Sequence, residues 1–306
     1  MNHPKAFING VLLLDKPKGL SSNKALGLTK KIFNAKKAGH AGTLDPLATG
    51  ILPILFGEAT KFAEFGLDSD KRYFADISLG IKTSTGDVEG EVIERRIFDE
   101  NINVNKILDS FVGKQFQIPP MYSALKFQGK PLYKYARAGL EIKRKRRSID
   151  IKSIKLVSWK KSFLRIDVIC SKGTYIRTLA EDIGEKLGSC AHLFNLRRVE
   201  VGGFGIDQSV NIDRLELLAA SEPDILKREL RPVDSFINYL PSVQLKVQQE
   251  KKFLSGQVIE VNLYSLMRED KNLVRVYGFS NDFLGTGQIV NNRLLYPKRL
   301  ISKQTY

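Results

Sequence analysis

The sequence lacks the features that mark several large classes of protein. It holds only two cysteines, Cys170 and Cys190, which cannot form a disulfide framework and fit a reducing compartment. Its apolar runs are short and interrupted, so no segment is long enough to cross a bilayer as a helix. Residues 1–7 lack the apolar stretch of a secretion signal. We therefore expect a cytoplasmic protein that neither spans a membrane nor depends on disulfides.

Motifs for common cofactors and catalytic groups are also missing. There is no GxxxxGK[ST] phosphate loop, no complete dinucleotide fingerprint and no GxSxG nucleophile elbow. The three histidines are too dispersed for an HExxH site, and Cys190 with His192 offers too few ligands for zinc. We therefore expect no metal and no cofactor. If the chain is an enzyme, its chemistry must come from carboxylates, hydroxyls and arginines.

What the sequence has in excess is positive charge. Among 306 residues, 49 are Lys or Arg and 33 are Asp or Glu, which gives a net charge of +16. Hydrophobic residues make up 42% of the chain, as in an ordinary folded protein with a substantial core. A basic field of this size attracts polyanions, so a nucleic acid is the expected partner. We expect the chain to act as a monomer.

Strand and helix patterns mix along the chain without a regular βαβ rhythm. Short apolar or alternating runs at 11–14, 51–56, 72–79 and 163–170 predict strands, and the strongest helical period covers 176–187. Such a mixture predicts an α+β fold with a mixed, largely antiparallel core sheet flanked by helices.

Three local features add detail to this expectation. The glycine-rich stretch 36–50 predicts a loop, and Pro53 predicts that the strand after it lies at a sheet edge or carries a bulge. Gly113 is expected to end a short helix that includes Ile107 and Val112.

A domain boundary is expected near 238–242, where Pro241 follows a helical stretch. It divides the chain into residues 1–240 and a small β-rich module, residues 241–306, with a short helix at 248–254. The pairs Lys251-Lys252 and Lys298-Arg299 in this module suit phosphate contacts or ordinary solvated surface equally well.

Two segments combine residue types that suit a catalytic or ligand-binding site. The stretch 39–50 combines three glycines, His40 and Asp45-Pro46, so its backbone can approach a ligand closely, although Asp-Pro also commonly forms a plain turn. The segment 170–177 places Tyr175 and Arg177 in the first turn of the strongest helix, directly after a strand. Helix amides there suit an anion, and an arginine there can hold a carboxylate in its ionised form.

Five motifs in this order resemble those of the TruB family, the bacterial tRNA pseudouridine synthases that act on the T-loop uridine at tRNA position 55. They are KPKGLSS at 16–22, GTLDP at 42–46, KRY at 71–73, PPMYSALK at 119–126 and SKGTYIR at 171–177. The resemblance spans residues 10–198. Residues 244–301 are more loosely similar to the PUA RNA-binding domain that closes such chains.

The resemblance implies a role for each matching residue. Asp45 matches the catalytic aspartate, Arg177 the arginine that pairs with it, and Tyr73 the tyrosine that stacks on the target base. Leu196 matches a leucine of the pocket wall, and His40 a histidine beside the flipped base. The remaining RNA contacts implied are those of Tyr175, Lys16, Lys126, Lys143, Arg144, Lys145, Arg146 and Arg147, the last five lying at the end of an RNA-gripping insertion at about 119–147.

Several alternatives remain open at this point. Tyr73 and Leu196 also fit plain core positions, because both fall on apolar strand faces, and the basic run 143–147 also fits a solvated strand end. For the whole chain, the rival functions are a non-catalytic RNA chaperone or assembly factor, and a pseudouridine synthase for a different RNA.

Overall fold

The structure is a computed structural model that describes residues 4–99, 102–261 and 272–302. Parts of the expected C-terminal domain, residues 262–271 and 303–306, lie outside the described residues. The catalytic and RNA-contact residues expected from the sequence are all within them.

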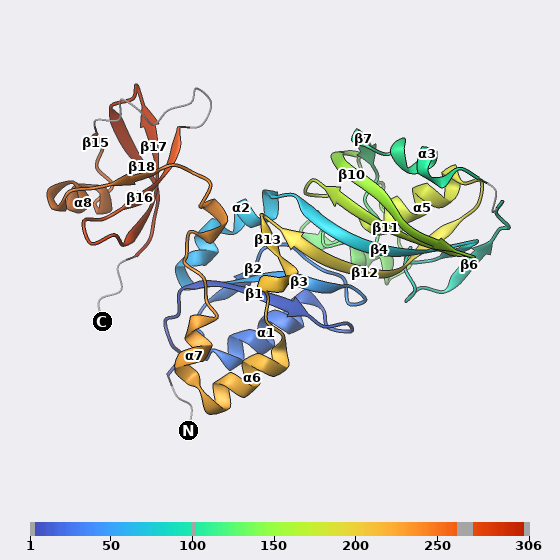
Figure 1. The fold of residues 1–306 in the computed structure, drawn as a ribbon, viewed down its shortest axis with the longest axis horizontal. Coiled ribbons are helices and arrows are strands. Elements are labelled where there is room, and N and C mark those ends of the chain that lie inside the picture. The colour runs from blue at the N-terminus through green and yellow to red at the C-terminus, as the bar shows by residue number, and fades with distance from the viewer. Residues whose placement is uncertain (1–3, 100–101, 262–271, 303–306) are drawn as a thin grey trace.

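A mixed sheet of nine strands forms the centre of the molecule (Figure 1). Seven strands follow in the order β1, β3, β12, β4, β11, β10 and β7, while β2 pairs with β3 and β13 pairs with β12. The neighbours are antiparallel, except that β3 and β12 are parallel. The strands are β1 Gly10–Lys16, β2 Ala38–His40, β3 Thr49–Phe56, β4 Lys71–Leu79, β7 Gly113–Gln117, β10 Arg147–Lys160, β11 Phe163–Cys170, β12 Ala191–Val201 and β13 Phe204–Gly205. The predicted α+β class with a largely antiparallel sheet is confirmed.

The two halves of the sheet are buried differently, and the sequence pattern follows this. Strand β1 is covered on both faces, with Leu12 and Leu14 in the main core and Val11 and Leu13 in a second apolar cluster. A continuous apolar run is therefore needed there. Strand β4 instead alternates between buried and partly exposed residues over its first half, because one face of the sheet stays open to solvent.

Helices cover the opposite face and the two ends of the sheet. Helix α5 packs on β12 and β4, α3 packs on β10, and α1 and α6 pack together beside β1 and β3. The N-cap of α1 is Ser21, whose hydroxyl accepts a hydrogen bond from the Lys24 amide. The α-helices are α1 Ser22–Ile32, α2 Ala63–Asp68, α3 Val104–Asp109, α4 Leu132–Ala136, α5 Ile176–Lys186, α6 Ile212–Ser221, α7 Pro223–Arg228 and α8 Val247–Leu254, with 3-10 turns at Gly57–Phe62, Ser235–Ile237 and Ile206–Gln208.

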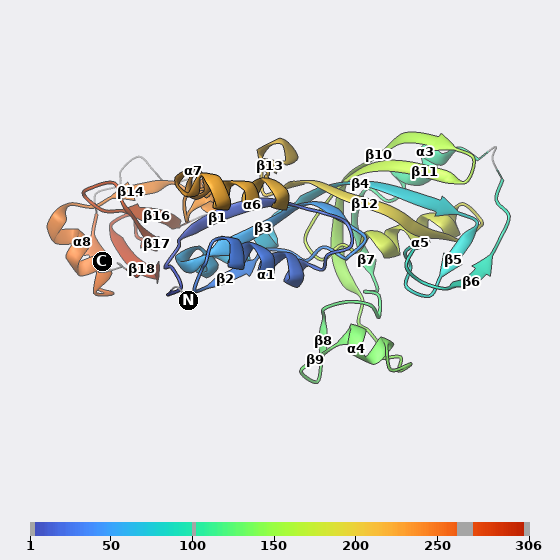
Figure 2. The same ribbon diagram turned by 90° about the horizontal axis from the view of Figure 1, so that it is seen from below.

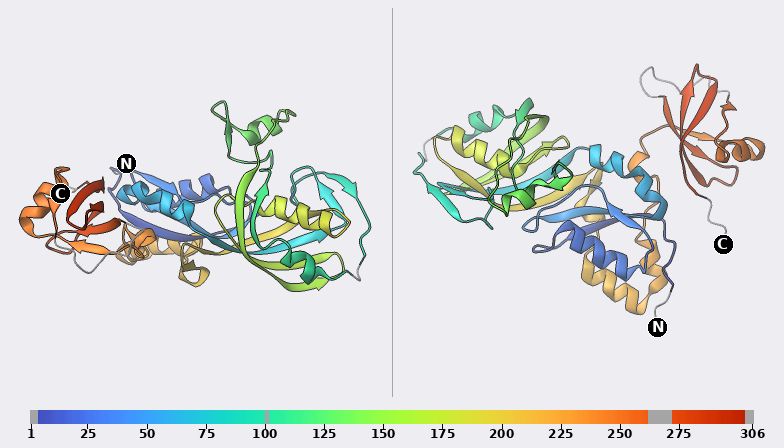
Figure 3. Two further views of the ribbon diagram at one scale, coloured as in Figure 1. Left: turned by 90° about the horizontal axis from the view of Figure 1, so that it is seen from above. Right: turned by 180° about the vertical axis from the view of Figure 1, so that it is seen from behind.

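Two excursions leave the sheet. A hairpin of β5 (Ile81–Thr83) and β6 (Val92–Arg95) follows β4. The segment 118–146 between β7 and β10, here called the arm, carries β8 (Lys126–Phe127), β9 (Lys130–Pro131) and α4. Figure 2 and the left view of Figure 3 show the arm standing well clear of the sheet.

The C-terminal residues build a second, smaller sheet with its own apolar core at one end of the molecule (Figure 1). Its order is β14, β16, β17, β18 and β15, and α8 packs against it. Arg275 anchors it to the larger part through an ion pair of 3.0 Å with the buried Asp234. The strands are β14 Ser242–Gln244, β15 Ile259–Glu260, β16 Leu273–Tyr277, β17 Phe283–Val290 and β18 Leu294–Leu300. The predicted β-rich C-terminal domain is confirmed, and its boundary at residue 240 stays a prediction.

Three local predictions are wrong. Strand β3, which contains Pro53, is an inner strand between β1 and β12; the proline is tolerated where β3 changes partner from β2 to β12. The predicted loop 36–50 contains the short strand β2. Gly113 does not end a helix, since α3 stops at Asp109, and it opens β7 instead.

Gly50 is expected to be essential for the parallel pairing of β3 with β12. Its φ is +100°, and a Cβ there would lie 2.1 Å from the Arg198 carbonyl oxygen. Gly113 has nearly the same φ, +104°, and no atom of the described residues lies within 4 Å of the added Cβ. In urea unfolding, Gly113→Ala should lose only the backbone strain of about 1–2 kcal/mol, and Gly50→Ala about 4 kcal/mol or more. Equal losses would contradict this reading of the contact.

Candidate active site

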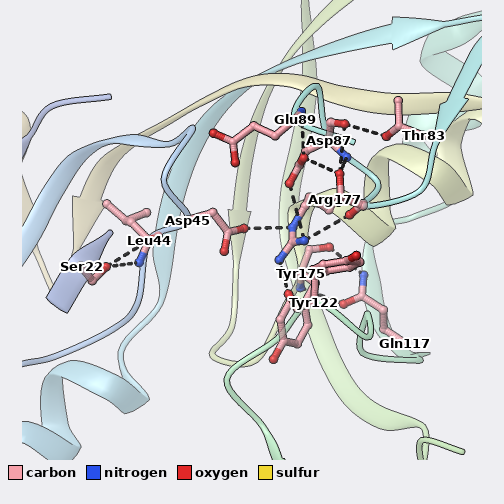
Figure 4. Close-up of polar contacts among 11 residues, drawn as sticks. Ser22, Leu44, Asp45, Thr83, Asp87, Glu89, Gln117, Tyr122, Tyr175 and Arg177 are labelled. Carbon is pink, nitrogen blue, oxygen red and sulfur yellow. Dashed lines mark hydrogen bonds and ion pairs between the residues drawn. The ribbon is translucent and has the colours of Figure 1, made fainter. Parts of the chain in front are cut away.

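Asp45 lies in a loop between β2 and β3 that is held in place at several points. The Ser22 hydroxyl donates to the Leu44 carbonyl oxygen at 2.9 Å and accepts from the Leu44 amide at 2.8 Å (Figure 4). The Gly19 amide donates to the Pro46 carbonyl oxygen at 2.7 Å. Because α1 and the turn before it hydrogen-bond to the loop, the Asp45 carboxylate projects from a fixed backbone.

Arg177 meets Asp45 from the other side of the site. It occupies the first turn of α5, and its Nε lies 2.9 Å from Asp45 Oδ2 (Figure 4). Its Nη1 donates to the Thr85 carbonyl oxygen at 3.1 Å and its Nη2 to the Tyr122 carbonyl oxygen at 2.6 Å. With 5% of its side chain exposed, Arg177 is locked in one orientation toward Asp45.

A second carboxylate, Asp87, was not predicted from the sequence. It is buried in the turn between β5 and β6, and its Oδ2 lies 3.6 Å from Arg177 Nη1. Its Oδ1 accepts from the Thr85 hydroxyl at 2.6 Å and the Glu89 amide at 3.1 Å. The turn-rich composition of 83–90 is visible in the sequence, but no spacing shows that this turn folds back onto α5.

A cavity of about 350 Å³ opens beside the Asp45–Arg177 pair. This volume is in the range of sites for small ligands. Five residues singled out from the sequence line it: Asp45, Tyr73, Tyr175, Arg177 and Leu196. Its wall also includes Leu44, Leu67, Lys71, Ser123, Leu125 and Arg198. Residues from five separate stretches of the chain thus meet in one hollow.

The two interpretations of Tyr73 and Leu196 turn out to be compatible. Tyr73 is 8% exposed and Leu196 6% exposed, both belong to the main core, and both line the cavity. Burial raises the pKa of the Tyr73 hydroxyl, with the nearby Arg198 opposing the rise. The cavity therefore offers an aromatic wall with a neutral phenol.

Tyr175 is the N-cap residue of α5 and is fixed through its backbone. Its amide donates to Gln117 Oε1 at 2.8 Å, and Gln117 Nε2 donates to its carbonyl oxygen at 3.1 Å (Figure 4). Burial raises the pKa of the Tyr175 hydroxyl. Strand β7 thereby positions the start of the helix that carries Arg177.

The electrostatics of Asp45 reflect opposing influences. Burial raises the pKa of its carboxyl above the ordinary value, and the nearby Asp87 adds to this rise. Arg177 and Lys16 act in the opposite direction and favour the carboxylate. Because 34% of the Asp45 side chain remains exposed toward the cavity, the group is both accessible and sensitive to its charged neighbours.

Lys16 does not lie where the resemblance implies an RNA contact. Its side chain has no exposed surface, and its Nζ donates to the carbonyl oxygens of Pro17 and Leu20 at 2.9 and 2.7 Å. Burial lowers its pKa to about 8, against the attraction of Asp45. Because Lys16 is fully buried, it influences the site through its charge near Asp45.

His40 lies on β2 near the site but is not part of the cavity wall. Its Nδ1 is buried and has no hydrogen-bond partner within the described part of the chain. Burial lowers the pKa of its ring, and the positive charge of Arg198 adds to this effect. His40 is therefore a neutral, half-buried histidine at the end of β2, next to the loop that carries Asp45.

The remaining predicted contacts belong to the arm and the start of β10. Lys126 is exposed on β8, and four members of the basic run, Lys143, Lys145, Arg146 and Arg147, are exposed as well. Arg144 differs, because its side chain is only 20% exposed and its Nη2 lies 3.1 Å from the Glu141 carboxylate. The run therefore presents four exposed cations rather than five.

Within the described ranges, no helix is long and apolar enough to cross a membrane. In the same ranges, no three His, Cys, Asp or Glu side chains gather in a way that could hold a metal ion.

Comparison with curated proteins finds close relatives over the whole chain. It is 46% identical to tRNA pseudouridine synthase B of Aromatoleum aromaticum, covering 98% of this chain and 95% of the relative. It is 43% identical to the protein of the same name from Pasteurella multocida, covering 97% of each.

Solved structures share the fold at lower sequence identity. A Cbf5-Nop10-Gar1 complex matches 96% of this chain and 85% of its own with a TM-score of 0.74 and 24% identity. An H/ACA RNP bound to a substrate RNA containing 2′-deoxyuridine matches 98% and 91% with a TM-score of 0.71 and 20% identity.

Three family models match consecutive parts of the chain. The N-terminal domain of the TruB family pseudouridylate synthases matches residues 30–176, the tRNA pseudouridylate synthase B C-terminal domain matches 177–238, and the C-terminal model of pseudouridine synthase II TruB matches 241–301. Together with the two relatives, these matches show that the chain belongs to the TruB family of tRNA pseudouridine synthases, which are isomerases.

Proposed function

We propose that this enzyme isomerises the T-loop uridine of tRNA, at position 55, with Asp45 as the catalytic carboxylate. The single observation that carries the proposal is the 2.9 Å pair of Asp45 with the locked Arg177 at the edge of a nucleoside-sized cavity. We also propose that the enzyme acts as a monomer in the cytoplasm.

The reaction rearranges the nucleoside without any redox change. The bond between C1′ and N1 breaks, the detached uracil turns, and a bond forms between C1′ and C5. The proton on C5 is lost and N1 gains one, so substrate and product are isomers. Asp45 attacks the ribose, attacks the base or helps to form a glycal intermediate. On each of these routes it must reach the target nucleotide as a carboxylate. One third of its side chain is exposed in the cavity and is available for this contact.

The other cavity residues receive roles from their positions. Arg177 orients the carboxylate and, with Lys16, favours its charged form. Tyr73 offers its ring to the base, since stacking of a base on an aromatic side chain is worth about 1–3 kcal/mol. Leu196 and Tyr175 close the wall of the pocket.

Reaching a uridine inside a folded T-arm requires it to be flipped out of its stack, at a cost of a few kcal/mol. His40 lies beside the loop where the extruded base would enter. The arm and the exposed cations at the start of β10 would grip the backbone of the T-arm. The C-terminal domain would add RNA contacts as a PUA-like module, with shape recognition supplying most of the specificity.

Asp45→Asn is expected to lower the rate of pseudouridine formation by about 10⁴-fold or more. RNA binding should stay nearly intact, because the amide keeps the shape of the carboxylate and loses its charge. The measurement is single-turnover conversion of an unmodified tRNA transcript, with the modified position mapped. Asp76→Asn, which changes an ion-paired carboxylate on the open face of the sheet, serves as the control. Retained turnover in Asp45→Asn, or modification at another position, would contradict the proposal.

Lys16→Met is expected to shift the acid side of the pH profile to higher pH. Activity requires ionised Asp45, so it is lost as the pH falls through the pKa of this group. The charge of Lys16 lowers the pKa of Asp45, so removing this charge raises the pKa of Asp45 further. Single-turnover rates across pH measure the shift, with Lys18→Met at an exposed neighbouring lysine as the control. Coincident acid limbs in the two variants would show that Lys16 has no electrostatic role.

Lys145→Gln is expected to weaken tRNA binding and to reduce the log–log salt slope by about 0.7–0.9, the value for one phosphate contact. Arg144→Gln should reduce it less, because Glu141 already neutralises that guanidinium. Dissociation constants measured over a range of salt concentrations test both variants. Equal slopes for Lys145→Gln and the wild-type protein would exclude Lys145 as a phosphate contact.

A further inference from the structure

The buried cations of this protein are concentrated at one place. Four lysine or arginine side chains are buried within the described residues: Lys16, Lys71, Arg177 and Arg198. Three of them, Lys71, Arg177 and Arg198, line the cavity beside Asp45. The fourth, Lys16, lies close enough to Asp45 to influence its charge.

Among the residues that the structure describes, only one of the four cations forms an ion pair. Arg177 has two carboxylates, Asp45 and Asp87. Lys16, Lys71 and Arg198 form no ion pair with any carboxylate among the described residues. Lys16 and Lys71 donate to backbone carbonyl oxygens, and Arg198 donates to backbone carbonyl oxygens and hydrogen-bonds the Tyr73 hydroxyl. Because a buried charge without a counter-charge is costly, this excess of positive charge needs an explanation.

Arg198 shows how closely such a cation is built into the site. Its side chain is 1% exposed, its Nε donates to the Ile51 carbonyl oxygen at 2.7 Å, and its Nη2 reaches the Gly42 carbonyl oxygen at 3.4 Å. It therefore supports the loop that carries Asp45. In the sheet it stands opposite Tyr73, whose hydroxyl it influences.

Lys71 supports the opposite rim of the cavity. Its Nζ donates to the carbonyl oxygens of Gly66 and Leu67 at 3.1 and 2.6 Å, at the end of α2, and Leu67 also lines the cavity. A neutral donor could satisfy these carbonyl oxygens without burying a charge. The positive charge itself is thus the feature that hydrogen bonding leaves unexplained.

We propose that Arg198 and Lys71 supply a fixed positive field that stabilises the detached uracil as an anion. When the C1′–N1 bond breaks, its electron pair stays on the base and spreads over N1 and the two carbonyl oxygens. The negative charge disappears again when C1′–C5 forms and the C5 proton is transferred. Preorganised charges in a site shielded from water stabilise such a transient anion without reorganisation. This inference rests on the proposed function. It explains which groups stabilise the base after the C1′–N1 bond breaks and before the C1′–C5 bond forms.

The test compares uridine with 5-fluorouridine at the target position of a T-arm RNA. Fluorine withdraws electrons and stabilises the uracil anion, so bond breaking then depends less on the protein. The measurement is the single-turnover rate at which the N-linked nucleoside disappears, for both RNAs with the same enzyme preparation. The quantity compared is the rate for 5-fluorouridine divided by the rate for uridine. This ratio is independent of the fraction of protein that is correctly folded.

Arg198→Met should slow the reaction of uridine by about 100-fold, the usual effect of losing one group that stabilises developing charge. The reaction of 5-fluorouridine should slow less, so the ratio should rise by about 10-fold over the wild-type value. Arg198→Lys keeps the charge and should bring the ratio back toward wild type. Where Arg198→Met does not fold, Lys71→Met tests the same ratio.

Arg197→Met is the matched control. Arg197 is the neighbour of Arg198 on β12, but its guanidinium lies on the partly exposed face and pairs with Asp15 at 2.8 Å. Its ratio should equal that of the wild-type protein. A ratio unchanged in Arg198→Met or Lys71→Met, with an active wild type, would overturn this inference alone. A wild-type enzyme inactive on the T-arm uridine would overturn the proposed function together with it.

Discussion

The ion pair between Asp45 and Arg177 is the interaction on which the rest of this structure depends. A carboxylate in a partly desolvated cavity tends to take up a proton, and Arg177 opposes that tendency. The arginine is itself immobilised by Asp87 and by two backbone carbonyl groups. The arm, the β5–β6 turn and α5 therefore converge on one side chain, and through it on Asp45.

The topology of the sheet makes this pairing possible. Strand β12 pairs in parallel with β3 and antiparallel with β4, so the loop before β3 and the Tyr73 side chain of β4 come to the same place. Gly50 is needed there, because the Arg198 backbone passes where a Cβ would lie. The candidate site gains a rigid frame from these strands, and the cost is a concentration of buried charge at its centre.

The parts proposed to contact RNA are organised differently from the centre. The arm stands clear of the sheet and carries exposed cations (Figure 2). The C-terminal sheet has its own core and meets the larger part through an apolar cluster, in which Phe62 packs on Phe283, and through polar contacts such as Asp234 with Arg275. Under the proposed function, the exposed cations contribute affinity that depends on salt, whereas the buried ones act on the reacting nucleotide. The same basic composition thus serves two separate purposes.

The sequence by itself determined the α+β class, four strands of the core sheet, the helices α5 and α8, and five of the residues that line the cavity, because hydrophobic period and ordered motifs are local properties. Only the tertiary structure decided that β3 is an inner strand despite Pro53, that Asp87 supports Arg177, that Lys16 is buried and that Arg144 pairs with Glu141. Burial and pairing of charges depend on which distant segments meet, and no spacing along the chain records that.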